Sequence, residues 1–205
     1  FPLRDLRNID ILDLCAAPGG KTIQILDKGL NVLSVDKNII KINIIKNNLD
    51  RMNFDSHIIC EDASKMKLNK FFDVILIDAP CSATGTIRKN PDILLRKNNS
   101  NYESLLERQM KILKNASEFL KRNGLLMYIV CSLEKIEGEK IIKHFCAQNN
   151  NFKIEPIFES EINLRKKRVC TSNGLLQILP DTFYFPENRL LDGSNGFFSS
   201  IIRKV

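Results

Sequence analysis

Short apolar segments alternate with longer amphipathic segments along this 205-residue chain, up to about residue 148. The apolar segments are rich in Ile, Leu and Val, as buried strands are, and the segments between them carry apolar side chains at helical spacing. Strands that alternate with helices predict one parallel sheet covered by helices on both faces. The predicted strands are residues 9–14, 31–35, 57–60, 72–77 and 125–130, and the predicted helices start at residue 21 and span 38–52, 102–121 and 137–148.

The alternation weakens after residue 149. Residues 152–157 and 197–202 fit a sixth and a last strand, which predicts an α/β fold with a mostly parallel, seven-stranded sheet. Residues 159–195 contain several glycines and prolines and are typical of a long loop region, which in a compact domain is usually functional or mobile. We expect residues 1–205 to form a single domain, because the length suits one core.

A turn of small residues joins the first predicted strand to the first predicted helix. Residues 13–21 read Asp-Leu-Cys-Ala-Ala-Pro-Gly-Gly-Lys, and the two glycines let the backbone bend tightly and approach a ligand. The segment lacks the glycines that a phosphate-binding P-loop or a dinucleotide-binding turn requires. With Asp13 before it, the turn suits a cofactor that carries an ammonium group, as S-adenosylmethionine does.

Acidic residues stand at or beside the ends of four successive predicted strands, namely Asp13, Asp36, Asp62 and Asp78. Asp36 ends the second strand, where a carboxylate accepts the hydroxyl groups of an adenosine ribose. Asp62 follows the third strand, within reach of the adenine edge. Each residue alone also fits a turn or an N-cap. Their common position favours one cofactor site at the carboxyl edge of the sheet.

Two cysteines follow neighbouring predicted strands. Cys81 comes shortly after Asp78, and Cys131 directly follows residues 125–130. A thiolate that adds to C6 of cytosine makes C5 able to attack a methyl sulfonium, provided that the base lies outside the duplex stack. Asp78 is placed to assist at N3 of the ring. Cys131 alone fits a small strand residue, but its pairing with Cys81 favours the catalytic interpretation.

The composition favours a nucleic-acid partner. The net charge of +7 fits binding to RNA, although a lysine-rich solvated surface explains it as well. The six cysteines form no Cys-x-x-Cys pair, so we expect no metal site and a reducing, cytoplasmic location. No apolar run is long enough to span a membrane. We expect a monomer.

Several segments resemble the bacterial RsmB/Sun-type rRNA cytosine-C5 methyltransferases. They are LDLCAAPGGKT at 12–22, DAPCSATGTIR at 78–88, Asn-Pro-Asp at 90–92, YIVCSLEKIEGE at 128–139, LQILP at 176–180 and NGFF at 195–198. The resemblance implies a class I S-adenosylmethionine-dependent methyltransferase with a Rossmann-like fold, which forms 5-methylcytosine in 16S rRNA. It implies Cys131 as the nucleophile, Cys81 as the cysteine that helps release the product, and Lys21 as a residue that orients Asp78. It further implies cofactor contacts from Cys15, Ala16, Ala17, Pro18, Gly19, Gly20, Lys21, Asp36, Asp62 and Asp78.

The chain departs from the family pattern at two single positions and in extent. Val130 stands where the family usually has Thr or Ser, and Asn195 where it usually has Asp, and neither change removes a proposed catalytic group. The sequence begins at Phe1 without the N-terminal helical RNA-binding region that such members usually carry, so we expect a catalytic domain. Within it, Arg88, Lys89 and Arg96 are candidate phosphate contacts.

Other functions remain open at the level of sequence. The same chemistry on tRNA or on another rRNA needs the same motifs. A DNA cytosine methyltransferase fits less well, because its nucleophile is the Pro-Cys cysteine after the fourth strand and a second cysteine at the position of Cys131 is missing there. A non-catalytic RNA-binding factor for ribosome assembly is the third alternative, against which the intact cysteines and acidic residues argue.

Overall fold

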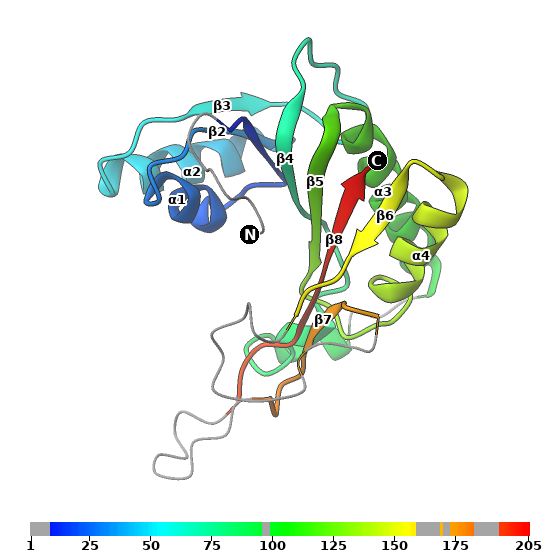
Figure 1. Ribbon diagram of the computed structural model, residues 1–205. Helices are drawn as coiled ribbons and strands as arrows, with labels where there is room; N and C mark the ends of the chain where they lie inside the picture. Colours follow the sequence, from blue (N-terminus) through cyan, green and yellow to red (C-terminus); the bar gives the residue numbers. More distant parts are fainter. Residues whose placement is uncertain (1–8, 96–98, 159–168, 170–172, 183–192) are drawn as a thin grey trace.

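A mixed β-sheet forms the centre of the computed structural model, which describes residues 9–95, 99–158, 169, 173–182 and 193–205 (Figure 1). Strands β1 to β5 pair in parallel, and β8 runs antiparallel between β5 and β6, so the sheet has the order β3-β2-β1-β4-β5-β8-β6, with β7 also paired to β8. The strands are β1 (Ile11–Leu14), β2 (Val32–Asp36), β3 (His57–Cys60), β4 (Phe72–Asp78), β5 (Leu120–Val130), β6 (Phe152–Glu155), β7 (Leu176–Ile178) and β8 (Phe197–Lys204).

Helices cover both faces of this sheet, because successive side chains of a strand point to opposite faces. Leu12 packs in one cluster with Ile112 of α3, whereas its neighbour Ile11 packs in another with Ile25 of α1. Figure 1 shows α1 and α2 beside β2 and β3, and α3 and α4 beside β5, β8 and β6. The helices are α1 (Gly20–Leu26), α2 (Ile39–Arg51), α3 (Asn99–Glu118) and α4 (Glu139–Gln148), and two short 3-10 helices span Thr84–Thr86 and Pro91–Leu94.

The predicted order of strands and helices is confirmed except for β7, which was not predicted, and the boundaries differ most at β5 and α3. Strand β5 begins at Leu120, where we expected the end of a helix, because Leu120 already pairs with Phe72 before a register shift in the ladder. Asn123, two residues after the predicted end of that helix, is a left-handed residue (φ 63°) within this strand. Helix α3 begins at Asn99, three residues before the predicted start.

Strand β7 lies in the stretch that we predicted to be a loop region. It pairs with residues 197–199 of β8, whereas β6 pairs with residues 201–204 of the same strand. A three-residue strand is too short to show a period of two in the sequence. Because β6 and β7 pair with different parts of β8, the edge of β8 that faces away from β5 is hydrogen-bonded along most of its length.

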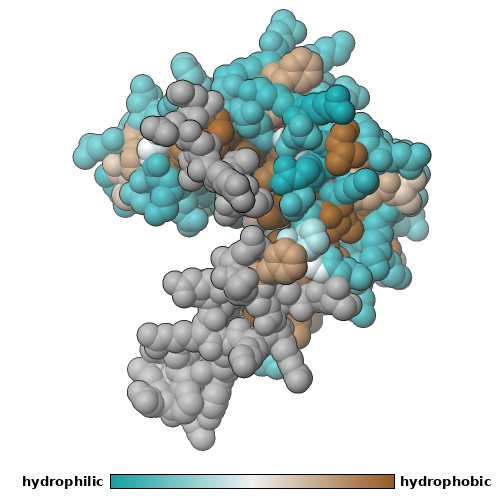
Figure 2. Space-filling model, in the orientation of Figure 1, coloured by the Kyte–Doolittle hydropathy of each residue, from teal (hydrophilic) through white to brown (hydrophobic). Residues whose placement is uncertain are grey.

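Hydrophilic side chains cover most of the described surface on the face shown in Figure 2, and apolar side chains gather there only in small patches. Within the described part of the chain, no helix combines the length and the apolar character that a membrane crossing requires.

Candidate active site

The turn after β1 owes its shape to two backbone positions in the left-handed region. Cys15 has a φ of 60° and Gly19 a φ of 100°. Gly19 immediately precedes α1, and a Cβ added to it would lie 3.2 Å from Cγ2 of Ile45 on α2. A side chain at this position would therefore meet both conformational strain and a close contact. The Cys15 thiol packs against the core, and burial raises its pKa to about 12, so it stays protonated.

Asp13 is the most deeply buried of the four acidic residues at the strand ends. It lies one residue before the end of β1, on the sheet face that α1 covers, and its Oδ2 accepts a hydrogen bond of 2.7 Å from Thr22. Thr22 in turn lies 3.0 Å from the hydroxyl of Ser34. Burial raises the pKa of Asp13 to about 7. Through Oδ2 it attaches α1 to the sheet, whereas its Oδ1 has no hydrogen-bond partner among the described residues.

Asp36 joins the turn after β1 to the start of α2. Its carboxylate accepts hydrogen bonds from the backbone of Ala17 (3.4 Å) and of Asn38 (3.2 Å). The Asn38 side chain caps α2 by accepting from two backbone N–H groups of its first turn. Because a carboxylate oxygen has more than one acceptor direction, Asp36 retains the capacity to bind ribose hydroxyls.

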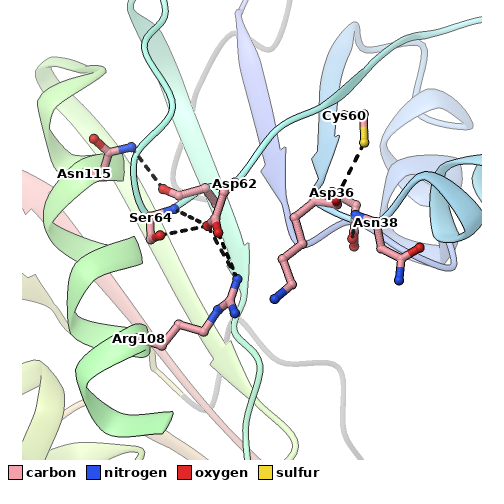
Figure 3. Close-up of polar contacts among 9 residues, drawn as sticks. Asp36, Asn38, Cys60, Asp62, Ser64, Arg108 and Asn115 are labelled. Carbon is pink, nitrogen blue, oxygen red and sulfur yellow. Dashed lines mark hydrogen bonds and ion pairs between the residues drawn. The ribbon is translucent and has the colours of Figure 1, made fainter. Parts of the chain in front are cut away.

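Asp62 is held by residues from two different segments. Ser64 donates to it through its backbone N–H (3.0 Å) and its hydroxyl (2.7 Å), and Arg108 reaches it from α3 at 3.3 Å. Burial alone would raise the pKa of Asp62, but these hydrogen bonds and the guanidinium lower it below its ordinary value. Figure 3 shows Asp62, Ser64 and Arg108 together on one side, and Asp36 with Asn38 on the other. Our sequence reading missed Ser64 and Arg108.

Lys21 and Asp78 form an ion pair at the carboxyl end of β4. The Nζ atom of Lys21, in the first turn of α1, lies 2.6 Å from Oδ2 of Asp78, and both side chains are about one third exposed. The family resemblance implied that Lys21 orients Asp78, and in the structure the two side chains are in contact. The pair links the glycine turn to the strand end that leads into the Cys81 segment.

The sulfur atoms of Cys81 and Cys131 lie 3.2 Å apart, within hydrogen-bonding distance. The hydrogen bond from Cys81 lowers the pKa of Cys131, although burial opposes this effect. The same hydrogen bond, together with burial, raises the pKa of Cys81. Cys81 also packs against the hydrophobic core. The contact therefore favours the thiolate form of Cys131 over that of Cys81, with Cys81 as the hydrogen-bond donor.

A buried carboxylate connects the segments that carry these two thiols. Glu137, which is fully buried, accepts hydrogen bonds from Ser82 and from Ser132, the residues that directly follow the two cysteines. Gln109 of α3 donates to the same carboxylate at 2.9 Å. Glu137 was not predicted as a site residue from the sequence. The one indication of its importance was its position in the segment 128–139, which carries part of the family resemblance.

Gly85 and Gly196 fix a third segment beside the thiols. The backbone N–H of Gly85 donates to the carbonyl of Cys131 (3.0 Å), and its carbonyl accepts from Gly196 (2.8 Å). A Cβ on Gly85 would lie only 1.9 Å from the Gly196 carbonyl oxygen. The Asn-Gly-Phe-Phe segment thus reaches the active-site side of the sheet through this backbone contact.

The remaining candidate residues fall into three groups. Cys60 is exposed and Cys146 is half-buried. Arg88 and Lys89 lie on the surface after the Cys81 segment. Arg96 and Cys170 lie outside the described residues. Among the residues that are described, no group of His, Cys, Asp and Glu has the arrangement of a metal site.

Residues 3–201 match the protein family described as 16S rRNA methyltransferase RsmB/F. The chain belongs to the RsmB/F family. It is 36% identical over 202 residues to the probable ribosomal RNA small subunit methyltransferase B of Bacillus subtilis, and 39% identical over 205 residues to the ribosomal RNA small subunit methyltransferase B of Pasteurella multocida. Each match includes 95% of this chain but only 43% and 42% of the two relatives.

Solved structures confirm the class I S-adenosylmethionine-dependent methyltransferase fold for this RsmB/F chain. The NSun6 protein of Pyrococcus horikoshii superposes with a TM-score of 0.74 and 26% identity, over 97% of this chain and 48% of that protein. An S-adenosylmethionine-dependent methyltransferase from Clostridium acetobutylicum superposes with a TM-score of 0.55 and 13% identity, over 95% and 83% of the two chains. The second likeness concerns the fold alone.

Proposed function

We propose that this RsmB/F chain transfers a methyl group from S-adenosylmethionine to C5 of a cytosine in 16S rRNA, through a covalent bond between Cys131 and C6. The observation that carries the proposal is the contact between the Cys131 and Cys81 sulfur atoms at 3.2 Å. A lowered pKa on Cys131 supplies the thiolate that nucleophilic addition needs. The ion pair of Lys21 with Asp78 adds a charged group on the neighbouring strand end.

The residues at the carboxyl edge of the sheet fit the cofactor. The turn from Cys15 to Lys21 would hold its amino-acid part, Asp36 its ribose, and Asp62 its adenine edge. Two features of these carboxylates support this assignment. Asp36 can accept further hydrogen bonds beyond those from Ala17 and Asn38, and Ser64 and Arg108 hold the Asp62 carboxylate in one orientation. When bound, S-adenosylmethionine supplies an electrophilic methyl group on a sulfonium.

Cys131 opens the reaction. Its thiolate adds to C6 of the cytosine, which moves electron density toward N3 and C5 of the ring. A proton shared between N3 and the Asp78 carboxyl group stabilises this charge. Lys21 fixes the orientation of Asp78 through the 2.6 Å contact to Oδ2, so that the carboxyl group meets the ring in one geometry. C5 then carries the density that attacks the methyl group.

Cys81 acts after the methyl group has been transferred. Its pKa is raised chiefly because it donates a hydrogen bond to Cys131. Once the Cys131 sulfur is bonded to C6, it is no longer a thiolate, and this contribution to the Cys81 pKa disappears. Cys81 then releases its thiol proton to solvent, and the resulting thiolate removes the proton from C5, after which the C6–S bond breaks and Cys131 leaves as a thiolate. The two cysteines therefore have different roles.

The partner of the proposed reaction is RNA with an unpaired or extruded cytosine. The relatives from B. subtilis and P. multocida are named for the small-subunit ribosomal RNA, which supports 16S rRNA as the substrate. We further propose that residues 1–205 form one catalytic domain and work as a monomer, without a metal ion. Free thiols at Cys81 and Cys131 suit a reducing compartment, so we place the activity in the cytoplasm.

Methyl transfer to purified RNAs tests this function. The protein is incubated with S-adenosylmethionine and unmodified 16S rRNA, with tRNA as the parallel substrate, and 5-methylcytosine is measured by mass spectrometry of the nucleosides. We expect 5-methylcytosine in 16S rRNA only. Its appearance in tRNA alone would support the alternative target, and RNA binding without methylation under saturating cofactor would support a non-catalytic assembly factor.

A further inference from the structure

Glu137 occupies an unusual place for a carboxylate, because it is fully buried between the two segments that carry the reactive thiols. On one side, its Oε1 accepts from the Ser82 backbone N–H at 2.8 Å, and its Oε2 accepts from the Ser82 hydroxyl at 2.5 Å. On the other side, Oε2 accepts from the Ser132 hydroxyl at 2.5 Å. Each of these serines is the immediate neighbour of one cysteine. A single carboxylate therefore bridges the turn after β4 and the turn after β5.

The surrounding contacts make this bridge rigid. The Gln109 side chain donates to Oε1 of Glu137 and to the carbonyl of Pro80, the residue before Cys81, at 2.9 Å each. The backbone carbonyl of Glu137 accepts from the buried hydroxyl of Tyr128 at 3.0 Å. Both ends of Glu137 are thus anchored, one by the side chains around its carboxylate and one by strand β5. Hydrogen bonds to a buried carboxylate are stronger than those between neutral groups and are costly to leave unmade.

The geometry points to Glu137 as the positioning residue that sets the distance between the Cys81 and Cys131 sulfur atoms. It acts through Ser82 and Ser132, and therefore does not need to touch the substrate. The inference rests on the proposed function, since the spacing of the thiols matters for methyl transfer only if Cys131 adds to the base. The spacing itself is nevertheless measurable without RNA or cofactor.

The first test measures how readily the two thiols can be joined. Diamide oxidises two thiols to one disulfide and takes up their two protons and two electrons, so the rate of a Cys81–Cys131 bridge reports how often the sulfurs meet. Peptide mapping by mass spectrometry separates this bridge from other cysteine products. We expect the bridge to form about tenfold more slowly in Glu137→Gln than in the unchanged protein, because an NH2 group then replaces one of the two acceptor oxygens to which Ser82 and Ser132 donate.

Glu139→Gln is the matched control. Glu139 lies two residues further along the chain, and its carboxylate pairs with Lys143 at 2.6 Å on the surface of α4. This variant removes an equal charge near the same position without touching the thiol segments, and it should form the bridge at the unchanged rate. Thermal unfolding of all variants shows that they are folded, and Glu137→Gln is chosen over Glu137→Ala because it keeps the side-chain volume.

The second test follows the alkylation of Cys131 by iodoacetamide as a function of pH. A greater distance between the two sulfur atoms weakens the hydrogen bond from Cys81, which is the largest contribution that lowers the Cys131 pKa. Loss of the Glu137 charge removes a smaller contribution that raises this pKa, so the net alkylation profile of Glu137→Gln should move to higher pH. With RNA and cofactor, its kcat should fall while its KM for S-adenosylmethionine stays the same. A Glu137→Gln protein that melts at a lower temperature but keeps the bridging rate and the alkylation profile would overturn the inference. If the thiol measurements change as expected while the unchanged protein fails to methylate RNA, the positioning inference stands and the proposed function fails.

Discussion

Lys21 Nζ and Asp78 Oδ2 lie 2.6 Å apart, which joins the helix after the glycine turn to the strand end before Cys81. If Lys21 orients the Asp78 carboxyl group toward the base, then Lys21→Met leaves that group free to rotate. We expect kcat for methyl transfer to fall about a hundredfold, because a positioned acid or base contributes on this scale. The KM for RNA should change little. Steady-state kinetics with 16S rRNA measures both.

Lys28→Met serves as the control for this prediction, since Lys28 is an exposed lysine shortly after the same helix. It removes the same charge from the same region and should leave kcat unchanged. Equal losses of kcat in the two variants would mean that the positive charge acts at long range on RNA and that the contact with Asp78 is incidental.

The lowered pKa of Cys131 depends on its neighbour. Because the hydrogen bond from Cys81 favours the thiolate, Cys81→Ala should raise the Cys131 pKa and move its alkylation profile to higher pH. Iodoacetamide labelling at Cys131, quantified by mass spectrometry between pH 6 and pH 10 (roughly the range in which thiols titrate), gives the profile. Cys81→Ser retains a hydroxyl donor and should shift it less. Identical profiles for all three proteins would contradict the assigned hydrogen bond.

Arg108 of α3 forms an ion pair with Asp62 at 3.3 Å beside the candidate cofactor site. Arg108→Gln removes this ion pair and lets the carboxylate turn, so we expect S-adenosylmethionine to bind about tenfold more weakly, the scale for one hydrogen bond to a charged group. Isothermal titration calorimetry gives the affinity. Arg51→Gln, at the exposed end of α2, is the control. An unchanged affinity in Arg108→Gln would exclude a role for this pair in cofactor binding.

Asp13 predicts a pH dependence of folding stability. Burial raises its pKa to about 7 from an ordinary value of 3.8. A carboxyl group of this kind contributes its full stabilisation below its ordinary pKa of 3.8, and this contribution falls as the pH rises from there until it is lost above about 7. Asp13→Asn cannot ionise, so its free energy of unfolding relative to the unchanged protein should rise between acidic and mildly alkaline pH, by on the order of 4 kcal/mol. Urea denaturation at each pH measures the difference, and a flat or falling difference would contradict the prediction.

The order of elements and the shared edge of the candidate site follow from sequence because both depend on local patterns. Apolar runs reveal strands, and parallel strands bring their carboxyl ends to one edge, so Asp36, Asp78 and Cys131 could be placed on one side of the sheet. The burial of the Asp13 side chain was not predicted, although its position within β1 explains it. Alternation along that strand turns its side chain toward α1 and away from solvent.

The partners of the site residues could not be predicted in the same way. Glu137 lies 55 positions from Ser82, and Arg108 lies 46 positions from Asp62. In the sequence, each is one charged residue among many, and charged residues are mostly found on surfaces. Only the packing of α3 and of the turn after β5 onto the sheet shows that these two are the ones that hold the site together. Boundaries such as the start of β5 at Leu120 depend on pairing with a distant strand in the same manner.

The covalent adduct between protein and RNA is the measurement that tests the different roles of the two cysteines most directly. Cys131→Ala and Cys81→Ala are each incubated with 16S rRNA and S-adenosylmethionine, and products are separated by denaturing electrophoresis. The account predicts no adduct and no methylation with Cys131→Ala, and an accumulating adduct with Cys81→Ala, because the C5 proton then has no base to remove it. Normal methylation by both variants, or an adduct that forms through Cys81 in the absence of Cys131, would contradict it.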